Sequence, residues 1–370
     1  MDLNNFSVRG PCMIIGGGGW MGSFLTHQLV QFKIDSIHIV DIVRPKDDLK
    51  FCHVDEKVIF HECDISKADD VLRLVEQVVP LVVFHMAAVI DLRVRPHANL
   101  HRVNVVGTEN IIKAMNCLDT SVTRYLIYTS SIDVATGLSG MRDVEDNDPY
   151  PADASNKYQL SKIAAEQLVV KANSSHLKTI SLRPGHVFGP YDPIIDTVLK
   201  FPFAVGPSWP QMSLVFVGNA AFAHILALYG LLNETSNIQK KDSICGQCYF
   251  ITDFDENFCD FYFRLANRKP SIFRIPDLIL RVLIWIVEFI QIYLSWLIPI
   301  DFFHPVTGLS SESVKPCVYF TVRSDRARHV LNYKPSSTPS VLSNISEAKA
   351  GVISREAAIE YTQKWLFSRN

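Results

Sequence analysis

The residues with the clearest capacity for chemistry in this chain are Tyr158 and Lys162. If the stretch is helical, a spacing of four places the phenol and the ammonium on one face. A nearby positive charge favours phenolate, so we expect the pKa of Tyr158 to fall from its usual value of about 10 toward working pH, where general acid–base catalysis is most effective. Surface pairs share this spacing, so its meaning depends on the residues upstream.

A glycine-rich loop follows the first predicted strand. It comprises Gly16-Gly17-Gly18-Gly19-Trp20-Met21-Gly22, and residues 23–32 after it have helical spacing. Glycines permit a tight turn and the close approach of a phosphate, while the amides that open the helix point toward negative charge. Two registers fit, G-x-x-G-x-x-G from Gly16 and G-x-G-x-x-G from Gly17. Strand, loop and helix together predict a dinucleotide site.

Acidic residues end the next two predicted strands. Asp41 closes the second strand at the distance after Gly22 that suits a ribose-binding carboxylate. Its charge would repel a 2′-phosphate, which favours NAD over NADP, although Arg44 could soften that preference. Asp64-Ile65 end the third strand, where the acid could hold the adenine amino group. A solvated strand end and a turn-starting acid stay open as alternatives.

Short apolar runs alternate with helical patterns through the first half of the chain. The predicted strands are residues 12–15, 37–40, 58–61, 81–85, 125–128 and 179–182, and the predicted helices are 21–32, 68–78, 104–116 and 157–172. Buried parallel strands joined by crossover helices form a doubly wound sheet. We therefore expect an α/β fold of the Rossmann type.

The regular alternation ends after residue 185, where Pro, Gly and aromatic residues become more frequent. This change in composition predicts a smaller second lobe, built from shorter elements, that forms one wall of the substrate site. We expect an NAD-binding Rossmann domain over residues 1–190, with a return segment near 211–252, and a C-terminal substrate lobe over 191–370.

Composition excludes several classes of function. The formal net charge of −2 at pH 7 offers no excess of cations for a nucleic acid backbone, so we expect no nucleic acid partner. Cys245 and Cys248 form a lone C-x-x-C without a second pair at zinc-site spacing, so we predict no metal site. The polar start of the chain lacks the basic and apolar regions of a secretion signal, so we expect the catalytic part to face the cytosol.

One strongly apolar segment runs over residues 276–299. Its polar residues fall on one narrow helical stripe, which comprises Asp277, Arg281, Glu288, Gln291 and Ser295. A charged side chain facing lipid at mid-bilayer would cost about 2.5 kcal/mol or more, which favours a helix lying in the membrane interface. A spanning helix and a helix buried against protein or a second subunit stay open as alternatives.

The order of these motifs resembles that of the extended short-chain dehydrogenase/reductase superfamily. Two further matching elements are His85-Met86-Ala87-Ala88 and Tyr128-Thr129-Ser130-Ser131. Residues 216–226 and 246–251 resemble signatures of its 3β-hydroxysteroid dehydrogenase/Δ5-isomerase branch. Residues 329–335 resemble the closing LGYKP element of that branch, with Asn332 in place of glycine. The resemblance covers nearly the whole chain.

This resemblance implies roles for individual residues. Tyr158 would be the general acid/base, Lys162 would lower its pKa and hold the nicotinamide ribose, and Ser131 would orient the substrate oxygen. Ser130 is the neighbour that could be confused with Ser131, but side chains alternate along a strand and only one of the two should face the site. Asn104 would complete the proton-relay group.

The resemblance also implies a set of cofactor-binding residues. These are Gly16, Gly19, Trp20, Met21, Gly22, Asp41, Asp64, Ile65, Ala87, Tyr158, Lys162, Pro184 and Val187. Within this set, Pro184 and Val187 belong to the segment that would pack on the nicotinamide carboxamide.

The implied activity is NAD-dependent oxidation of a 3β-hydroxyl on a steroid or sterol to the 3-ketone. Coupled Δ5-Δ4 isomerisation is a family-level expectation to which we can assign no residue. The absence of Lys and Arg between residues 201 and 232 fits a bulky apolar alcohol better than a sugar nucleotide. Two alternatives stay open, a decarboxylating sterol-4α-carboxylate 3-dehydrogenase and a non-catalytic NAD-binding interaction protein.

The remaining expectations concern location and partners. We expect contact with membrane lipid through residues 276–299, at the cytosolic face of the endoplasmic reticulum, with a mitochondrial membrane as the alternative. The chain is compatible with a homodimer.

Overall fold

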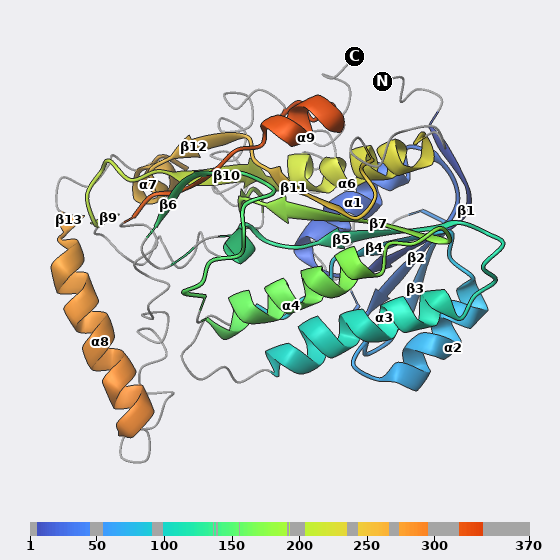
Figure 1. The fold of residues 1–370 in the computed structure, drawn as a ribbon, viewed down its shortest axis with the longest axis horizontal. Helices are drawn as coiled ribbons and strands as arrows, with labels where there is room; N and C mark the ends of the chain where they lie inside the picture. Colours follow the sequence, from blue (N-terminus) through green and yellow to red (C-terminus); the bar gives the residue numbers. More distant parts are fainter. Residues whose placement is uncertain are drawn as a thin grey trace.

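The computed structural model describes residues 6–44, 55–90, 99–135, 137, 140–154, 156–190, 192, 204–234, 243–265, 274–294 and 318–335. Several predictions fall outside these residues, among them the end of the apolar segment, which includes Ser295. The described chain forms a larger lobe around one parallel sheet and a smaller lobe around a second sheet (Figure 1).

The larger lobe is built on a seven-stranded parallel sheet with the order β11-β7-β5-β4-β1-β2-β3. Its strands are β1 (Ser7–Ile15), β2 (Lys33–Asp41), β3 (Val58–Glu62), β4 (Val82–His85), β5 (Arg124–Thr129), β7 (Leu177–Pro184) and β11 (Gln247–Ile251). Every predicted strand overlaps one of these. The prediction of a Rossmann-type α/β fold is therefore confirmed.

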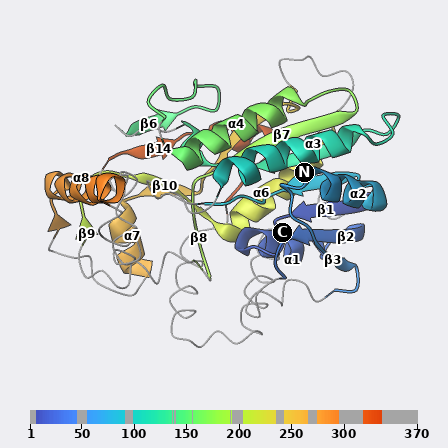
Figure 2. The ribbon, with the colours of Figure 1, turned by 90° about the horizontal axis from the view of Figure 1, so that it is seen from below.

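Helices cover both faces of this sheet (Figure 2). On one face lie α2 (Ala68–Val78), α3 (Gly107–Asn116) and α4 (Lys157–Lys171), and on the other lie α1 (Trp20–Leu29) and α6 (Val217–Leu232). Alternate residues of β1 enter two separate cores: Cys12 and Ile14 pack with α1 and α6, while Met13 and Ile15 pack with α2, α3 and α4. Because both faces are covered, the strand is one continuous apolar run.

The predicted helices differ from the observed ones mainly at their ends. Residues 68–78 form α2 as predicted, and α4 ends one residue early. The helix predicted over 104–116 begins with a π-helical turn, η2 (His101–Val106). The first helix ends at Leu29 rather than residue 32, because the chain turns there so that Phe32 packs edge-on against Phe6 with 5.3 Å between ring centroids.

The smaller sheet has the order β12-β10-β14-β6, and β8 pairs with β10. Its strands are β6 (Met141–Val144), β8 (His186–Phe188), β10 (Met212–Phe216), β12 (Phe254–Glu256) and β14 (Phe320–Val322). They come from both sides of residue 190. The chain returns from β10 through α6 to β11, at the edge of the larger sheet beside β7. The predicted division into domains stays a prediction.

Shorter elements complete the described fold. These are η3 (Ile132–Ala135), the paired β9 (Ala204–Val205) and β13 (Arg274–Ile275), α7 (Phe258–Leu265) and α9 (Asp325–Val330). Asn332, just after α9, has φ of +52°. Asparagine tolerates this left-handed conformation better than most residues, so it can replace the glycine expected there.

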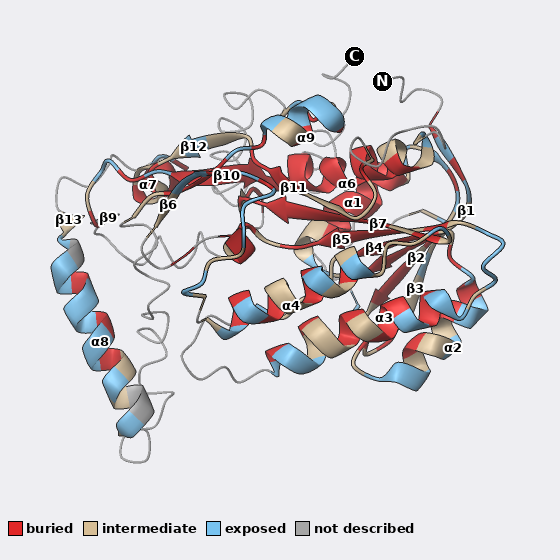
Figure 3. Ribbon diagram, in the orientation of Figure 1, coloured by how far each residue is buried: buried red, intermediate tan, exposed pale blue. Residues whose placement is uncertain are grey.

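Helix α8 (Asp277–Tyr293) extends from the smaller lobe with most of its surface exposed (Figure 3). Leu280, Ile284 and Val287 form its buried ridge, with Glu288 half-buried and Arg281 exposed. The exposed apolar residues of α8 are Leu278, Ile279, Val282, Leu283, Trp285, Ile286, Phe289 and Tyr293. In the described part of the chain, no helix combines the length and apolar character needed to span a membrane.

Candidate active site

The first turn of α4 carries Tyr158. The helix starts at that point because the side chain of Asn156 accepts hydrogen bonds from the amides of Tyr158, at 2.7 Å, and Gln159, at 3.3 Å. Lys162 follows one turn later. Its Nζ donates to the carbonyl of Thr129 at 2.6 Å and lies 4.6 Å from the centroid of the Tyr128 ring. The helix thus brings both predicted side chains against the end of β5.

The expected fall in the pKa of Tyr158 is wrong for this structure. Burial raises the pKa of Tyr158 well above its usual value, the negative charge of Asp133 adds to the rise, and a hydrogen bond with Ser131 opposes it. Burial lowers the pKa of Lys162 to about 7, although Glu166 and Asp133 act in the opposite direction. A spacing of four carries no information about burial, and burial dominates the pKa of both residues here.

Ser131 is the serine that meets Tyr158. The two side chains share a hydrogen bond, and Ser131 Oγ also donates to Asp133 Oδ2 at 3.3 Å. The neighbouring Ser130 is buried on the side of Glu166. This alternation agrees with the choice of Ser131 over Ser130, although its catalytic role stays a prediction.

Asn104 lies in η2 and is 1% exposed. Its Oδ1 accepts from the amide of Val89 at 2.8 Å, and its Nδ2 donates to the carbonyl of Val89 at 3.0 Å and to Ser161 Oγ at 2.9 Å. Asn104 therefore joins the segment after β4 to the catalytic helix. A part in proton relay stays a prediction.

The glycine loop leaves no room for side chains. Gly16 has φ of +83°, and a Cβ there would lie 2.5 Å from the amide nitrogen of Ala87. A Cβ on Gly22 would collide with the carbonyl oxygen of Gly16. Helix α1 starts next to the loop without a side-chain cap, so its first amides remain directed at the loop. This arrangement fits a pyrophosphate held by main-chain amides.

Trp20 and Gly18, both within this loop, make hydrogen bonds to other segments. Trp20 Nε1 donates to the carbonyl of Pro190 at 2.7 Å. Asp41 Oδ2 accepts from the amide of Gly18 at 3.1 Å, and Oδ1 accepts from the amide of Ile42 at 2.8 Å. Burial raises the pKa of Asp41, while these amides oppose the rise. Asp41 thus lies beside the loop, where its carboxylate could accept hydrogen bonds from a cofactor ribose.

Asp64 has a partner that the sequence did not reveal. Its carboxylate accepts from Ser66 Oγ at 2.7 Å and forms an ion pair with Arg102 Nη2 at 3.1 Å. Burial works against ionisation, but these hydrogen bonds and the charge of Arg102 hold the pKa of Asp64 below its usual value. Ile65 is buried beside it, and its carbonyl accepts from Asn110 Nδ2 at 2.9 Å.

The predicted cofactor residues gather at one edge of the larger sheet. The ends of β1, β2, β4, β5 and β7 carry Gly16, Asp41, Ala87, Ser131 and Pro184 or lie next to them. The chain order reverses between β1 and β4, and ligands of open α/β sheets bind outside the carboxyl ends at such a point. Val187 lies beyond this edge in β8, paired with Val215 of the smaller sheet. The predicted cofactor residues therefore extend from the larger sheet to a strand of the smaller one.

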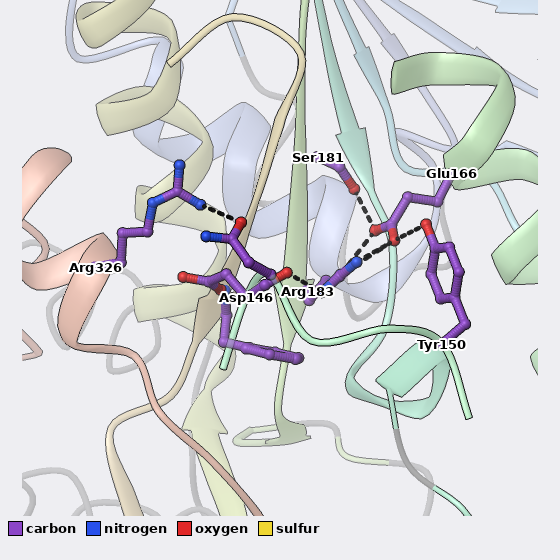
Figure 4. A network of polar contacts seen from close by, with 8 residues as sticks. Asp146, Tyr150, Glu166, Ser181, Arg183 and Arg326 are labelled. Atoms are coloured by element: carbon purple, nitrogen blue, oxygen red, sulfur yellow. Dashed lines mark hydrogen bonds and ion pairs between the residues drawn. The ribbon is translucent and has the colours of Figure 1, made fainter. Parts of the chain in front are cut away.

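A buried polar network behind the site was missed by sequence reasoning (Figure 4). Arg183 donates to Glu166 through Nε at 3.1 Å and Nη2 at 2.7 Å, and its Nη1 donates to the carbonyl of Asp146 at 2.9 Å. Tyr150 and Ser181 also donate to Glu166, at 3.0 Å and 2.7 Å. The available signal was the position of Glu166, four residues after Lys162 on the same helical face.

The fold and the order of these residues along the chain are those of the extended short-chain dehydrogenase/reductase superfamily. The model of the 3-beta hydroxysteroid dehydrogenase/isomerase family matches residues 13–269. The chain belongs to this family, whose members act on CH–OH groups.

Two relatives illustrate the similarity. The chain is 32% identical over 301 residues to 3beta-hydroxysteroid-dehydrogenase/decarboxylase isoform 2 of Arabidopsis thaliana, covering 75% of this chain and 51% of the relative. It is 32% identical over 255 residues to a decarboxylating sterol-4-alpha-carboxylate 3-dehydrogenase of Schizosaccharomyces pombe, covering 65% of this chain and 69% of the relative. The chain thus spans about half the length of the plant relative.

Solved structures confirm the fold. The structure of gox2253 has a TM-score of 0.67 at 20% identity and covers 92% of this chain and 97% of its own. A dTDP-glucose 4,6-dehydratase of Streptomyces venezuelae, DesIV, solved with NAD and TYD bound, has a TM-score of 0.66 at 14% identity, with the same two coverages. At these identities the likeness concerns the fold alone.

Proposed function

We propose that this protein oxidises the 3β-hydroxyl of a sterol to the 3-ketone, with NAD as the oxidant. The observation that carries the proposal is the meeting of Tyr158, Lys162 and Ser131 at the carboxyl edge of the larger sheet. A hydroxyl that approaches this edge can bond to the phenol and to the serine at once. NAD, when bound, supplies the acceptor for the hydride that leaves the carbinol carbon.

The chain's own groups handle the proton. Tyr158 takes the hydroxyl proton, and Ser131 holds the substrate oxygen against it. Because burial disfavours phenolate, Tyr158 needs the ammonium of Lys162 and the hydrogen bond of Ser131 to form that base. In the reverse direction the neutral phenol returns the proton to the ketone oxygen.

Of the two forms of substrate, the 4α-carboxysterol is favoured by the names of the relatives, which are decarboxylating sterol dehydrogenases. Oxidation at C3 makes a β-keto acid. The bond between C4 and the carboxylate carbon then breaks, carbon dioxide leaves, the electron pair of that bond forms an enolate with the C3 ketone, and C4 takes a proton. The second form is a 5-ene-3β-hydroxysteroid, favoured by the isomerase in the family's description. Its 3-ketone would shift the double bond into conjugation.

One assay separates these substrates. The protein is incubated with NAD and each sterol, and NADH absorbance, released carbon dioxide and the conjugated enone are followed together. We expect NADH with carbon dioxide from the carboxysterol. Tyr158→Phe should lower kcat by about 10²-fold or more, whereas Tyr229→Phe on α6 should not. Full activity in Tyr158→Phe, or no NADH from either sterol, would overturn the proposal.

We also propose that α8 lies along a membrane and brings the site close to dissolved sterol. The support is its outward face, where Leu278, Trp285 and Tyr293 are 69%, 66% and 63% exposed. Such a face, with amphipathic aromatic rings, suits the boundary between headgroups and acyl chains. The endoplasmic reticulum, at its cytosolic face, is the membrane proposed.

Vesicle flotation tests the attachment. Replacing Leu283, Trp285 and Phe289 with serine should release the protein from phosphatidylcholine vesicles. The control replaces exposed apolar residues of the larger lobe, Ile59 and Val122, and should leave flotation unchanged. Unaltered flotation of the α8 variant would refute the attachment, and cell fractionation with organelle markers tests the membrane.

A further inference from the structure

The side chain of Lys162 lies in a site that is almost closed to solvent. It is 2% exposed, and its two nearest partners are the carbonyl of Thr129 and the ring of Tyr128. Neither partner carries a net charge. A buried cation keeps its proton only where a negative charge offsets the lost hydration. The site therefore needs a carboxylate close to Lys162.

Glu166 meets this need from the next turn of α4. A spacing of four places it on the same face as Lys162, and its side chain is 0% exposed. Burial would favour the neutral acid, but the charge and hydrogen bonds of Arg183 and the bond from Ser181 hold the pKa of Glu166 below its usual value. Figure 4 shows how Arg183, Ser181 and Tyr150 surround the carboxylate. Glu166 is thus a permanent, buried negative charge.

The other titratable groups around Lys162 cannot supply the buried negative charge that Glu166 provides. They are Asp133 on η3, His85 on β4, Tyr128 on β5 and Tyr158 on α4. Burial raises the pKa of both tyrosines and lowers that of His85 to about 3, so these three are uncharged near neutral pH. The side chain of Asp133 is partly exposed, so water screens its interaction with Lys162.

We propose that Glu166 is a positioning residue that keeps Lys162 protonated and so able to hold the nicotinamide ribose. The inference rests on the proposed role of Lys162 but not on the identity of the sterol. Arg183 donates hydrogen bonds to both oxygens of the Glu166 carboxylate and keeps it ionised. The pair therefore acts on cofactor binding without touching the cofactor.

The proposal predicts a pH dependence of definite sign. The ammonium form binds the ribose, so affinity for NADH falls as pH rises through the pKa of Lys162. Removing the charge of Glu166 lowers that pKa, and the loss of affinity then occurs at lower pH. From the Coulomb energy of charges one helical turn apart at an effective dielectric constant of about 20, we expect a shift of about one pH unit or more.

The experiment measures the NADH dissociation constant of the full chain by fluorescence from mildly acidic through neutral to alkaline pH. Glu166→Gln should shift the midpoint down, and Glu166→Asp, which keeps the charge, should return it toward the wild-type value. Glu109→Gln on α3, an exposed acid paired with Lys113, removes the same charge elsewhere and should leave the midpoint unchanged.

Two outcomes complete the test. If Glu166→Gln does not fold, because Arg183 is left buried without a counter-charge, the double variant Glu166→Gln/Arg183→Gln removes both charges. Its midpoint should still shift down, but by less than that of Glu166→Gln, because loss of the Arg183 guanidinium raises the pKa of Lys162. A folded variant of either kind whose midpoint matches the wild type would overturn the proposal. Because NADH binding needs no sterol, a protein inactive on sterols that still shows the shift would refute the proposed function alone.

Discussion

Replacing Asp41 with asparagine should move the cofactor preference from NAD toward NADP. The carboxylate lies at the end of β2, held by the amides of Gly18 and Ile42. An asparagine keeps an oxygen for one of these amides and removes the charge. The loop should therefore keep its shape while it loses the group that repels a 2′-phosphate.

The size of the effect follows from the position of Asp41. Two unit charges at about 4 Å interact by about 4 kcal/mol at an effective dielectric constant of about 20. Asp41 is only partly buried and the next residues, Ile42 and Val43, are exposed, so water and salt reduce this to about 2 kcal/mol. That corresponds to a change of about 30-fold in the ratio of the two affinities.

The assay compares dissociation constants for NADH and NADPH by fluorescence titration at moderate salt. We expect Asp41→Asn to raise the affinity for NADPH relative to NADH by about 30-fold, with a smaller gain at high salt. Asp35→Asn, at the exposed beginning of the same strand, is the matched control. A ratio in Asp41→Asn within about twofold of the wild type would refute the electrostatic reasoning.

Three further substitutions test other parts of the site. Gly22→Ala places a Cβ against the carbonyl of Gly16, so NADH affinity should fall by about tenfold or more in the same titration; unchanged affinity would contradict the close packing of the loop. Asn104→Ala leaves the amide and carbonyl of Val89 without partners, so the free energy of unfolding in urea should fall by about 1–3 kcal/mol. Burial lowers the pKa of His224 to about 4, whereas the unfolded residue takes a proton near pH 6.5, so stability is lost as pH falls between these values by about 3 kcal/mol. His224→Gln should flatten that part of the urea-unfolding profile, and an unaltered slope would count against the assignment.

Six of the seven strands of the larger sheet could be predicted because they are local signals, whereas β11 was not among the predicted strands. Each is an apolar run that needs no knowledge of its neighbours, and the glycine loop and Asp41 stand at strand ends that the same runs define. The smaller sheet could not be predicted in this way. Its β6 pairs with β14, where the amide of Asp143 donates to Thr321 Oγ1 across 178 residues of sequence. No local pattern encodes such a partner.

The residues of the site were predicted more completely than their pKa values and ion pairs. Tyr158, Lys162 and Ser131 meet as expected, since helical spacing and strand alternation are geometric rules. The direction in which the pKa of Tyr158 shifts was predicted wrongly, because it depends on burial by segments that are distant in sequence. The pairing of Glu166 with Arg183 was missed for the same reason, since a helix and a separate strand supply the two charges.

The pairing of β6 with β14 also sets an order of assembly during synthesis. Strands β1 to β5 and β7 are complete once residue 184 has left the ribosome, so most of the larger sheet can form early. The smaller sheet must wait until β14 emerges, and β6 stays without that neighbour meanwhile. We therefore expect a nascent chain to form the glycine loop well before its smaller lobe is closed.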